Sequence, residues 1–435
     1  MCSGTSRVPL SRSADRCSRP ASREDFGPAS PDGAQSPSGG VPDPEGEDGA
    51  MREAGLVVVG AALAGLRAAT AARRTGYDGP VTLVGAEPHL PYDRPPLSKA
   101  FLADPDCAPP TLADADALSS LGIDLRLGEP ATGLSVSHRE VLIGQSTVPF
   151  DSLIIATGCA PVASPFGGHT LRTLDDARAI RARIPATERA VLVGGGFIGA
   201  EIASALRERG AAVTIVEAAD VPLVRAVGSE MASVLADRHR RNGVDLRCGT
   251  TVQAIDSNKV TLSDGSVLDA DLVIVGIGAR PAVGWLADSG LPLDDGVLCD
   301  ETLRAAPGIY AAGDAARWHN PLFSTTMRLE NWTSAAAQAE AAARNAVGPV
   351  ASPFSTVPYF WSDWYGDRIQ MVGVVTDDVT LLGSPADDSW LALYRAGDRL
   401  AGALALNQPG RIMKYRNRIT RRAAWQDALE FATAR

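Results

Sequence analysis

Three glycines and one acid in the middle of the chain have the spacing of a dinucleotide site. Gly194, Gly196 and Gly199 form an intact G-x-G-x-x-G pattern, and Glu217 follows 18 residues after the last of them. In this pattern the first glycine permits a tight turn, the second lets backbone approach a pyrophosphate, and the third lets a helix pack closely on a strand. An acid at this distance accepts hydrogen bonds from a ribose 2′-hydroxyl. The spacing therefore predicts that residues 190–217 bind a dinucleotide.

A second set of the same kind lies earlier in the chain. Gly60, Ala62 and Gly65 give G-x-A-x-x-G, and Glu87 stands 22 residues after Gly65. Alanine adds a methyl group where backbone must approach the phosphates, so the ligand is expected to lie slightly farther out. Two such sets predict two nucleotide domains and two dinucleotides, and a purely structural turn is the alternative for each set.

Each glycine set needs a strand before it and a helix after it. Apolar runs at 56–59 and 190–193 predict buried strands. Residues 66–75 are expected to form the first of the two helices. A helix N-terminus presents free N–H groups and a positive dipole end to phosphates. Two further buried strands, at 151–158 and 271–278, are expected to close the two units.

Two other stretches carry side chains suited to a cofactor. Residues 91–99, PYDRPPLSK, are expected to form an extended turn before a short helix, because prolines fix the backbone. The alternative is a surface loop with solvated Arg94 and Lys99. The strand at 308–314 ends on Asp314, which can reach a ribityl hydroxyl or a flavin phosphate and can equally cap a helix.

Composition and charge exclude several classes of protein. The 435 residues are 45% apolar and 21% charged, which suits two or three globular domains. A net charge of −10 argues against nucleic-acid binding, and no apolar run reaches the length of a membrane span. We therefore expect a cytoplasmic protein that binds neither nucleic acid nor membrane. The six cysteines include no C-x-x-C pair, so neither a metal site nor an adjacent redox dithiol is predicted.

Residues 1–50 differ in composition from the rest of the chain. They are rich in Ser, Pro, Gly, Asp and Arg and lack apolar periodicity, which predicts a disordered leader. Five arginines between positions 7 and 23 leave an organelle transit peptide as an alternative. The simpler interpretation is that the protein starts at Met51, just ahead of the first strand.

The order of these motifs resembles a known family. The motifs occur in the order G-x-A-x-x-G, PYDRPPLSK, ATG, GGGFIGAE, GIGARP, YAAGD and RLENW. This order resembles the FAD-dependent ferredoxin and rubredoxin reductases of Rieske oxygenase and cytochrome P450 systems, which are relatives of apoptosis-inducing factor. The resemblance covers about 54–422, and the stretch at 92–99 is its most specific part. Disulfide reductases of the same superfamily carry a cysteine pair near that stretch, and this chain does not.

The resemblance implies two cofactors, FAD and NADH. FAD would contact Gly60, Ala64, Gly65, Glu87, Arg94, Lys99, Ala131, Arg172, Asp314 and Trp332. NADH would contact Gly194, Gly196, Gly199, Glu217, Arg225 and Gly278. Phe197 matches the aromatic residue of the family that covers the flavin until nicotinamide displaces it.

Lys99, Glu201 and Phe197 are the predicted catalytic residues. Lys99 near the flavin ring would favour the anionic reduced form. Glu201, expected on the first turn of the second helix, would pair with Lys99. The alternative for Glu201 is a favourable interaction with the helix dipole, worth well under about 1 kcal/mol.

These observations predict an α/β fold with two Rossmann-like dinucleotide-binding domains and a C-terminal α+β domain. The FAD domain is expected at 54–168 and 284–346, the NAD domain at 169–283, and the C-terminal domain at 347–435. The predicted function is transfer of electrons from NADH through FAD to a ferredoxin or rubredoxin, because a flavin links hydride donors to one-electron carriers. An NADH oxidase or nitrite-reductase-like flavoprotein, and an NADH-sensing protein of the apoptosis-inducing-factor type, are alternatives. A homodimer is left open.

Two features of the last domain allow more than one interpretation. The aromatic residues between 359 and 365 are expected to form core rather than a docking surface. The basic residues that follow are either a solvated helix or a docking patch for an acidic ferredoxin, since complementary charge steers encounter. These are Arg411, Lys414, Arg416, Arg418, Arg421 and Arg422.

Overall fold

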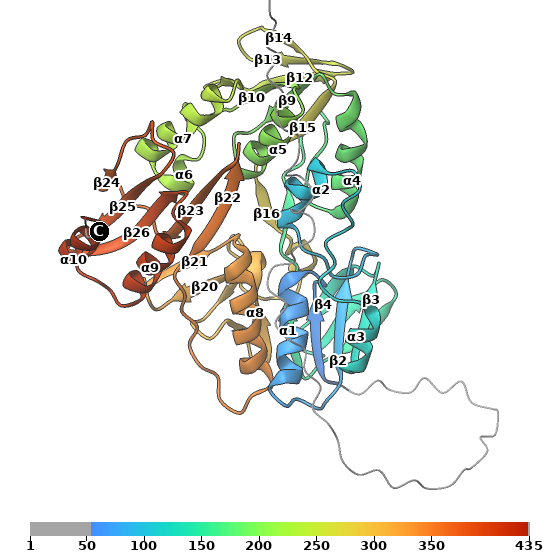
Figure 1. Ribbon diagram of the computed structural model, residues 1–435. Coiled ribbons are helices and arrows are strands. Elements are labelled where there is room, and N and C mark those ends of the chain that lie inside the picture. The colour runs from blue at the N-terminus through green and yellow to red at the C-terminus, as the bar shows by residue number, and fades with distance from the viewer. Residues whose placement is uncertain (1–53, 434–435) are drawn as a thin grey trace, which may run out of the picture. The chain divides into compact units, whose positions relative to one another are not determined.

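The computed structural model describes residues 54–433, and the leader expected at 1–50 lies outside this range. The chain from Ala54 onward forms one compact unit built around three larger sheets (Figure 1). Within the described residues, no helix is both long enough and apolar enough to cross a membrane.

The first sheet has six strands in the order β18-β19-β7-β1-β2-β3, parallel except for β18. Its strands are β1 (Leu56–Val59), β2 (Val81–Gly85), β3 (Ile123–Leu127), β7 (Ser152–Ile155), β18 (Arg304–Ala306) and β19 (Ile309–Ala311). Every residue of β1 is buried, because the core around this sheet includes residues of helices and also of the small sheet at 131–149, and a strand covered on both faces becomes a continuous apolar run. The strand predicted at 56–59 is confirmed.

Helices α1 (Leu63–Arg74) and α8 (Trp332–Val347) pack against this sheet and lie side by side (Figure 1). Alanines such as Ala68 and Ala342 line their contact and let the two backbones approach closely. The first helix begins at Leu63 and not at Leu66 as expected, because Ala62 already takes the extended N-cap conformation. Two short helices, α2 (Ala100–Ala103) and α3 (Ala115–Ser120), complete this region.

The second sheet has four parallel strands in the order β11-β10-β9-β15. Its strands are β9 (Arg189–Val193), β10 (Ala212–Val216), β11 (Asp245–Arg247) and β15 (Leu272–Val275). The helices of this part are α4 (Leu174–Arg183), α5 (Phe197–Glu208), α6 (Val224–Val227) and α7 (Ser229–Arg241). The strands predicted at 190–193 and 271–278 are confirmed in their apolar cores.

Four small sheets attach to the two large ones. They are β4-β5-β6 (Ala131–Ser135, Glu140–Ile143, Ser146–Pro149), β12-β13-β14 (Val252–Asp256, Lys259–Leu262, Val267–Asp269), β17-β20-β21 (Val297–Cys299, Ala316–Asn320, Thr325–Arg328) and β8-β16 (Cys159–Pro161, Ala279–Pro281). The antiparallel pair β8-β16 joins the segment that leaves the first sheet to the segment that leaves the second. In sequence, four strands of the first sheet precede the strands of the second sheet, and two follow them. The exact domain boundaries stay a prediction.

The third large sheet is antiparallel, with the order β22-β23-β26-β25-β24. Its strands are β22 (Tyr359–Trp364), β23 (Asp367–Gly373), β24 (Val379–Leu382), β25 (Trp390–Ala396) and β26 (Arg399–Leu406). One face packs on α9 (Pro409–Thr420) and α10 (Trp425–Thr433), and the other packs on α6, α7 and the start of α5. An α+β architecture results, and the predicted fold class is confirmed.

A buried histidine, His239, lies at the contact between α7 and β22 and predicts how the stability of the protein depends on pH. His239 is fully buried, stacks on Trp364 at 5.1 Å, and its Nδ1 lies 2.8 Å from the Tyr365 hydroxyl. Burial, assisted by the nearby charge of Arg240, lowers the pKa of His239 from 6.5 to about 4. Since the unfolded chain binds this proton near pH 6.5 and the folded chain does not, stability falls as the pH drops from 6.5 towards 4.

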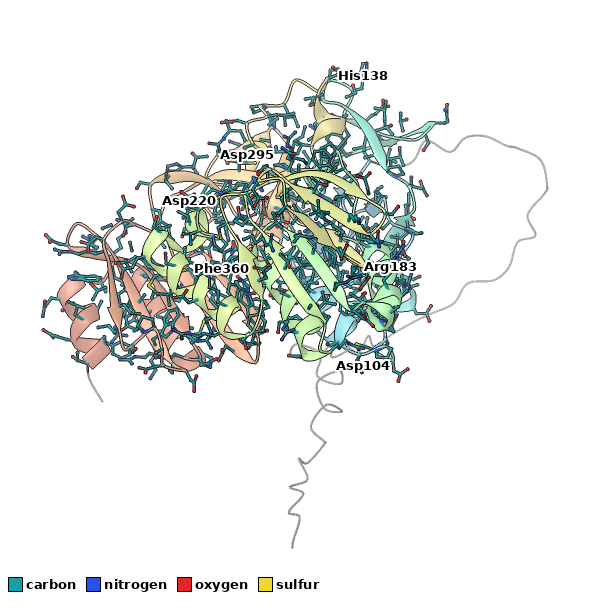
Figure 2. The ribbon with its side chains drawn as sticks, turned by 90° about the horizontal axis from the view of Figure 1, so that it is seen from above. Asp104, His138, Arg183, Asp220, Asp295 and Phe360 are labelled. Atoms are coloured by element: carbon teal, nitrogen blue, oxygen red, sulfur yellow. The ribbon has the colours of Figure 1, made fainter. Side chains whose placement is uncertain are left out.

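We therefore expect the His239→Phe variant to lose less stability between pH 7 and pH 5 than the wild type, by about 2 kcal/mol. Urea unfolding at the two pH values measures this difference. His138→Gln, at an exposed position (Figure 2), is the control and should behave as wild type. Equal losses for His239→Phe and wild type would show that His239 does not titrate in this range.

Candidate functional site

One large cavity lies between the two parallel sheets and reaches the third. Its volume is about 1220 Å³, more than the roughly 300–1000 Å³ of a typical small-ligand pocket. Predicted site residues on its wall are Ala64, Arg94, Lys99, Arg172, Gly194, Gly196, Phe197, Glu201, Glu217, Arg225, Gly278, Asp314 and Trp332. The wall does not include Gly60, Gly65, Glu87, Ala131 or Gly199. The structure thus brings together residues from both glycine sets in one space, at the carboxyl ends of the strands.

The first glycine turn is shaped by backbone contacts that exclude side chains. Gly60 has φ +115°, and a Cβ on it would lie 2.2 Å from the carbonyl oxygen of Ala156. A Cβ on Gly65 would lie 1.7 Å from the carbonyl oxygen of Gly60. Both glycines therefore serve close packing below the cavity, which explains why they are absent from its wall. Ala62 forms the wall in their place and is the N-cap of α1.

The second turn repeats this arrangement with an open middle position. Gly194 has φ +100°, and its Cβ would meet the carbonyl oxygen of Gly276 at 2.3 Å. A Cβ on Gly199 would lie 2.7 Å from the carbonyl oxygen of Gly194. Gly196 differs, because no protein atom lies within 4 Å of its Cβ position. This open space at the N-terminus of α5 fits a pyrophosphate that approaches the backbone.

Glu217 is held at the end of β10 by the backbone around it. Its Oε2 accepts a hydrogen bond from the N–H of Gly195 at 2.8 Å, and its Oε1 accepts one from the N–H of Ala219 at 2.9 Å. The carboxylate therefore lies beside the glycine turn, as a ribose acceptor should. Arg225 on α6 also lines the cavity, is exposed, and has no ion-pair partner among residues 54–433.

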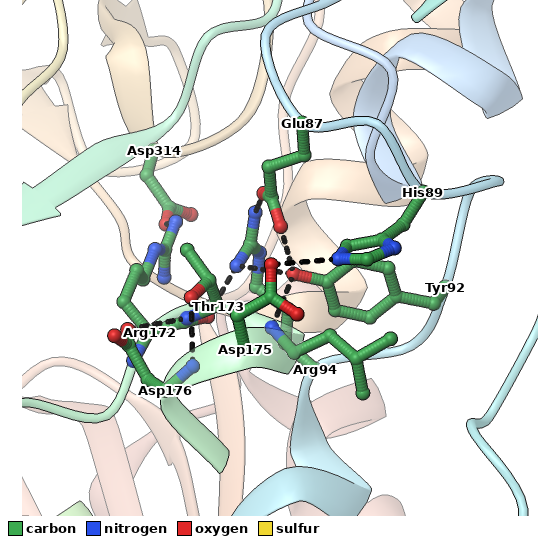
Figure 3. A network of polar contacts seen from close by, with 10 residues as sticks. Glu87, His89, Tyr92, Arg94, Arg172, Thr173, Asp175, Asp176 and Asp314 are labelled. Carbon is green, nitrogen blue, oxygen red and sulfur yellow. Dashed lines mark hydrogen bonds and ion pairs between the residues drawn. The ribbon is translucent and has the colours of Figure 1, made fainter. Parts of the chain in front are cut away.

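Glu87 belongs to a polar network around Tyr92 (Figure 3). The Tyr92 hydroxyl donates to Glu87 Oε2 at 2.5 Å, and Arg94 donates to Glu87 Oε1 at 2.7 Å. The same hydroxyl accepts the N–H of Leu174 at 3.0 Å, which ties the segment to the start of α4. Burial raises the pKa of Tyr92, so the phenol keeps its proton. Tyr92 does not line the cavity, but it positions Glu87 and Arg94, a role that the sequence interpretation did not assign.

Asp314 and Arg172 meet on the opposite side of the network (Figure 3). Arg172 Nη2 lies 3.2 Å from Asp314 Oδ2, and both side chains line the cavity. Burial raises the pKa of Asp314 despite the opposing charge of Arg172. A buried carboxylate facing a cavity is stabilised by hydrogen-bond donors, and a ribityl hydroxyl is such a donor. The alternative role of Asp314 as a helix N-cap is wrong, because Asp314 lies inside the short 3-10 helix Gly313–Ala315, whose N-cap is Ala312.

The predicted ion pair between Lys99 and Glu201 is present. Lys99 Nζ lies 2.7 Å from Glu201 Oε2, and the Glu201 side chain is only 6% exposed. Two hydroxyls, of Ser98 and Ser362, also donate to this carboxylate, each at 2.5 Å. One detail was wrong: α5 begins at Phe197, so Glu201 lies beyond the first turn, where the dipole interaction is weaker.

Aromatic residues from two helices, α5 and α8, meet aromatic residues of β22 at the cavity. Phe197 packs on Phe360 with ring centroids 4.7 Å apart, and Phe360 lies near the middle of the molecule in Figure 2. Trp332 packs on Trp361 at 6.2 Å. The expectation that the aromatic run is core holds for the fully buried Trp364 and is wrong for Phe360 and Trp361, which line the cavity.

No group of three or more His, Cys, Asp or Glu side chains in the described range is arranged to hold a metal ion. Ala131 lies on β4 of a small sheet, away from the cavity wall, and its flavin contact stays a prediction.

Cys159, Cys248 and Cys299 are free thiols, and burial raises the pKa values of Cys159 and Cys299 to about 12. These thiols are therefore poor nucleophiles.

Two parallel sheets that share a cavity, each with a glycine turn and a ribose-type acid, define a pyridine-nucleotide oxidoreductase. Residues 54–339 match the family described as pyridine nucleotide-disulphide oxidoreductase, and residues 359–432 match the reductase C-terminal family. The chain belongs to the pyridine nucleotide-disulphide oxidoreductase family.

Individual relatives are more specific. Rhodocoxin reductase of Rhodococcus erythropolis is 36% identical over 370 residues, which covers 81% of this chain and 86% of the relative. A 3-phenylpropionate/cinnamic acid dioxygenase ferredoxin–NAD(+) reductase component of Photorhabdus laumondii is 33% identical and covers 88% of this chain and 100% of its own. The solved covalent complex of putidaredoxin reductase with putidaredoxin has a TM-score of 0.81 at 33% identity, covering 85% of this chain and 93% of that chain. The resemblance deduced from the sequence motifs is confirmed.

Proposed function

We propose that this protein is an FAD-dependent oxidoreductase that passes electrons from NADH to a ferredoxin serving an oxygenase or cytochrome P450. The observation that carries the proposal is the single cavity in which both glycine turns meet the Lys99–Glu201 pair. A bound FAD would supply the conversion of a hydride into single electrons. The electron acceptor is inferred from the relatives, since one of them is named as the ferredoxin–NAD(+) reductase component of a dioxygenase.

The residues of this chain divide the work of binding between the two nucleotides. The turn at Ala62, together with Arg172 and Asp314, fits the pyrophosphate and ribityl parts of FAD. The open position at Gly196 and the carboxylate of Glu217 fit the pyrophosphate and ribose of NADH. Residues of both sets line one cavity, so that hydride donor and acceptor would be held together.

Three side chains lie where the two cofactors would meet. Phe197, at the first position of α5, projects an aromatic ring into the cavity and would cover the flavin until nicotinamide replaces it. Lys99 provides a positive charge, and Glu201 fixes the position of its ammonium group. A positive charge at this place favours a reduced, anionic flavin ring.

A rubredoxin in place of a ferredoxin, a homodimer and a cytoplasmic location are further parts of the proposal. The rubredoxin rests on the family resemblance of the sequence motifs, the cytoplasmic location rests on the acidic, ordinary globular composition, and the homodimer stays open.

The contribution of the basic C-terminal residues is narrower than the sequence suggested. The guanidinium groups of Arg411, Arg416 and Arg418 are half-buried against their own domain, whereas Lys414 and Arg421 are exposed.

We expect the Lys414→Glu, Arg421→Glu double variant to raise the KM for an acidic ferredoxin several-fold, because complementary charge steers the encounter. The effect should shrink as salt is added, since exposed charges are screened. Reduction of a small dye by NADH is the matched control and should not change. An unchanged KM at low salt would locate the docking surface elsewhere.

Steady-state turnover tests the function itself. The purified holoenzyme should reduce ferredoxin continuously with NADH, followed through cytochrome c. An NADH-sensing protein would instead be reduced slowly and would form a stable, oxygen-resistant complex with the nucleotide. An NADH oxidase would consume oxygen at the same rate with and without ferredoxin. Either behaviour would contradict the proposal.

A further inference from the structure

The carboxylate of Glu201 is a meeting point of three separate segments. Lys99 and Ser98, at the end of the short turn Pro95–Ser98, contact Oε2 at 2.7 and 2.5 Å. Ser362, on β22 of the C-terminal sheet, donates to Oε1 at 2.5 Å. Glu201 itself comes from α5. A single buried acid thus links the segment of Lys99, the helix of the second glycine turn and the C-terminal domain.

Ser362 is held in place by a hydrogen bond of its own. Its oxygen accepts the indole N–H of Trp364 at 2.7 Å, while its hydroxyl donates to Glu201. Side chains two residues apart on a strand share a face, so Phe360, Ser362 and Trp364 all point to the same side of β22. Phe360 lines the cavity, whereas Ser362 and Trp364 are fully buried behind it.

Few other charged or titratable groups face this carboxylate. Lys99 faces it from the segment after Pro95, and Asp93 acts on Lys99 from the same segment while its own carboxylate accepts the indole N–H of Trp332 at 2.6 Å. From α7, His239 stacks on the far side of the Trp364 ring. The Glu201 carboxylate therefore depends on hydroxyl donors and on one ammonium group for its stabilisation.

We propose that Ser362 is a positioning residue for the reaction: it holds the Glu201 carboxylate directed at Lys99, so that the C-terminal domain sets the charge beside the bound flavin. The inference rests on the proposed function, because Lys99 must lie near the flavin. Removal of the Ser362 hydroxyl takes away the donor to Glu201 Oε1, which frees the carboxylate to turn away from Lys99. It also leaves the Trp364 indole N–H without an acceptor.

The consequence concerns the midpoint potential of the bound flavin. When the Glu201 carboxylate turns away, Lys99 loses part of its counter-charge, and the flavin environment becomes more positive. The potential then rises, because a positive environment favours the reduced, anionic form. At a fixed pH, the midpoint potential of Ser362→Ala should therefore be higher than that of wild type.

The test measures the flavin midpoint potential of the holoenzyme at one fixed pH, by anaerobic titration with a chemical reductant. Ser204→Ala is the matched control. The Ser204 hydroxyl also joins α5 to the C-terminal domain in a buried site, by accepting the N–H of Tyr365 at 2.7 Å, but it does not touch Glu201. We expect a raised potential for Ser362→Ala, the wild-type potential for Ser204→Ala and restoration in Ser362→Thr.

A second pair of variants separates positioning from folding. In a Glu201→Gln background, Ser362→Ala should cause no further rise of the potential, because the charged carboxylate is gone. Should Ser362→Ala fail to retain FAD, Ser362→Cys replaces it, since a thiol has similar size but is a weak donor. Equal potentials for the Ser362 variant and wild type, an equal rise in Ser204→Ala, or a rise that persists without Glu201 would each overturn the inference. A wild-type protein that binds no flavin would instead overturn the proposed function.

Discussion

Replacing Gly65 with alanine is expected to weaken FAD binding by up to about 100-fold, since overpacking costs about 1–3 kcal/mol and each 1.4 kcal/mol is tenfold in affinity. The added Cβ would lie 1.7 Å from the carbonyl oxygen of Gly60. The oxygen belongs to backbone and the Cβ position is fixed by the α-carbon, so no rotamer change can relieve the contact. Helix α1 must move away from the turn, and its N-terminus with it. Reconstitution of the apoprotein with FAD, followed by flavin fluorescence, measures the loss.

Gly199→Ala is the matched variant on the other turn. Its Cβ would lie 2.7 Å from the carbonyl oxygen of Gly194. Because this turn is assigned to NADH, the variant should retain its flavin and lose tight NADH binding, measured as a raised KM. If Gly199→Ala lost the flavin and Gly65→Ala kept it, the two turns would have been assigned to the wrong nucleotides.

The second large effect is on nucleotide choice. Wild type should prefer NADH over NADPH by more than about tenfold in kcat/KM, because a 2′-phosphate near the Glu217 carboxylate would meet like charge. That carboxylate is fixed by the N–H groups of Gly195 and Ala219, so it cannot easily turn away. No basic residue stands next to it in sequence, since Ala218 and Ala219 follow.

Steady-state kinetics with both nucleotides on wild type and Glu217→Ala measure this preference. The variant should lose efficiency with NADH and narrow the gap to NADPH. Among the predicted NADH contacts on the cavity wall, Arg225 is the one with a positive charge. If Arg225 contributes to binding of the 2′-phosphate, Arg225→Ala should lower the efficiency with NADPH, so this variant is the control. Equal efficiencies in the wild type would mean that Glu217 does not face the ribose.

Local sequence predicted the parts of the site that depend on backbone conformation. Gly60 and Gly194 both have positive φ and a neighbouring carbonyl oxygen where a side chain would be. Such requirements are strict, so they leave a pattern in the sequence that spacing alone reveals. The apolar runs of β1 and of residues 190–193 in β9 were predictable for a similar reason, because burial on both faces favours apolar residues at every position.

The residues that the sequence did not assign act through tertiary contacts. Ser362 lies 161 residues from Glu201 in sequence, and no local pattern marks a serine as the donor to a distant carboxylate. Phe360 and Trp361 were expected in the core because aromatic clusters usually are, and only the packing of β22 against α5 places them on the cavity. The basic run near 411–422 shows the same limit, since sequence alone does not say which guanidinium groups pack inward.

Anaerobic addition of NADH to the purified, flavin-containing wild type tests the central claim most directly, because the claim is that both nucleotides meet in one cavity. The account predicts a yellow protein whose flavin absorbance bleaches rapidly and stoichiometrically with NADH, and slowly with NADPH. It also predicts that added ferredoxin restores the colour. A colourless protein that cannot be reconstituted with FAD, or a flavin that NADH does not reduce, would contradict it.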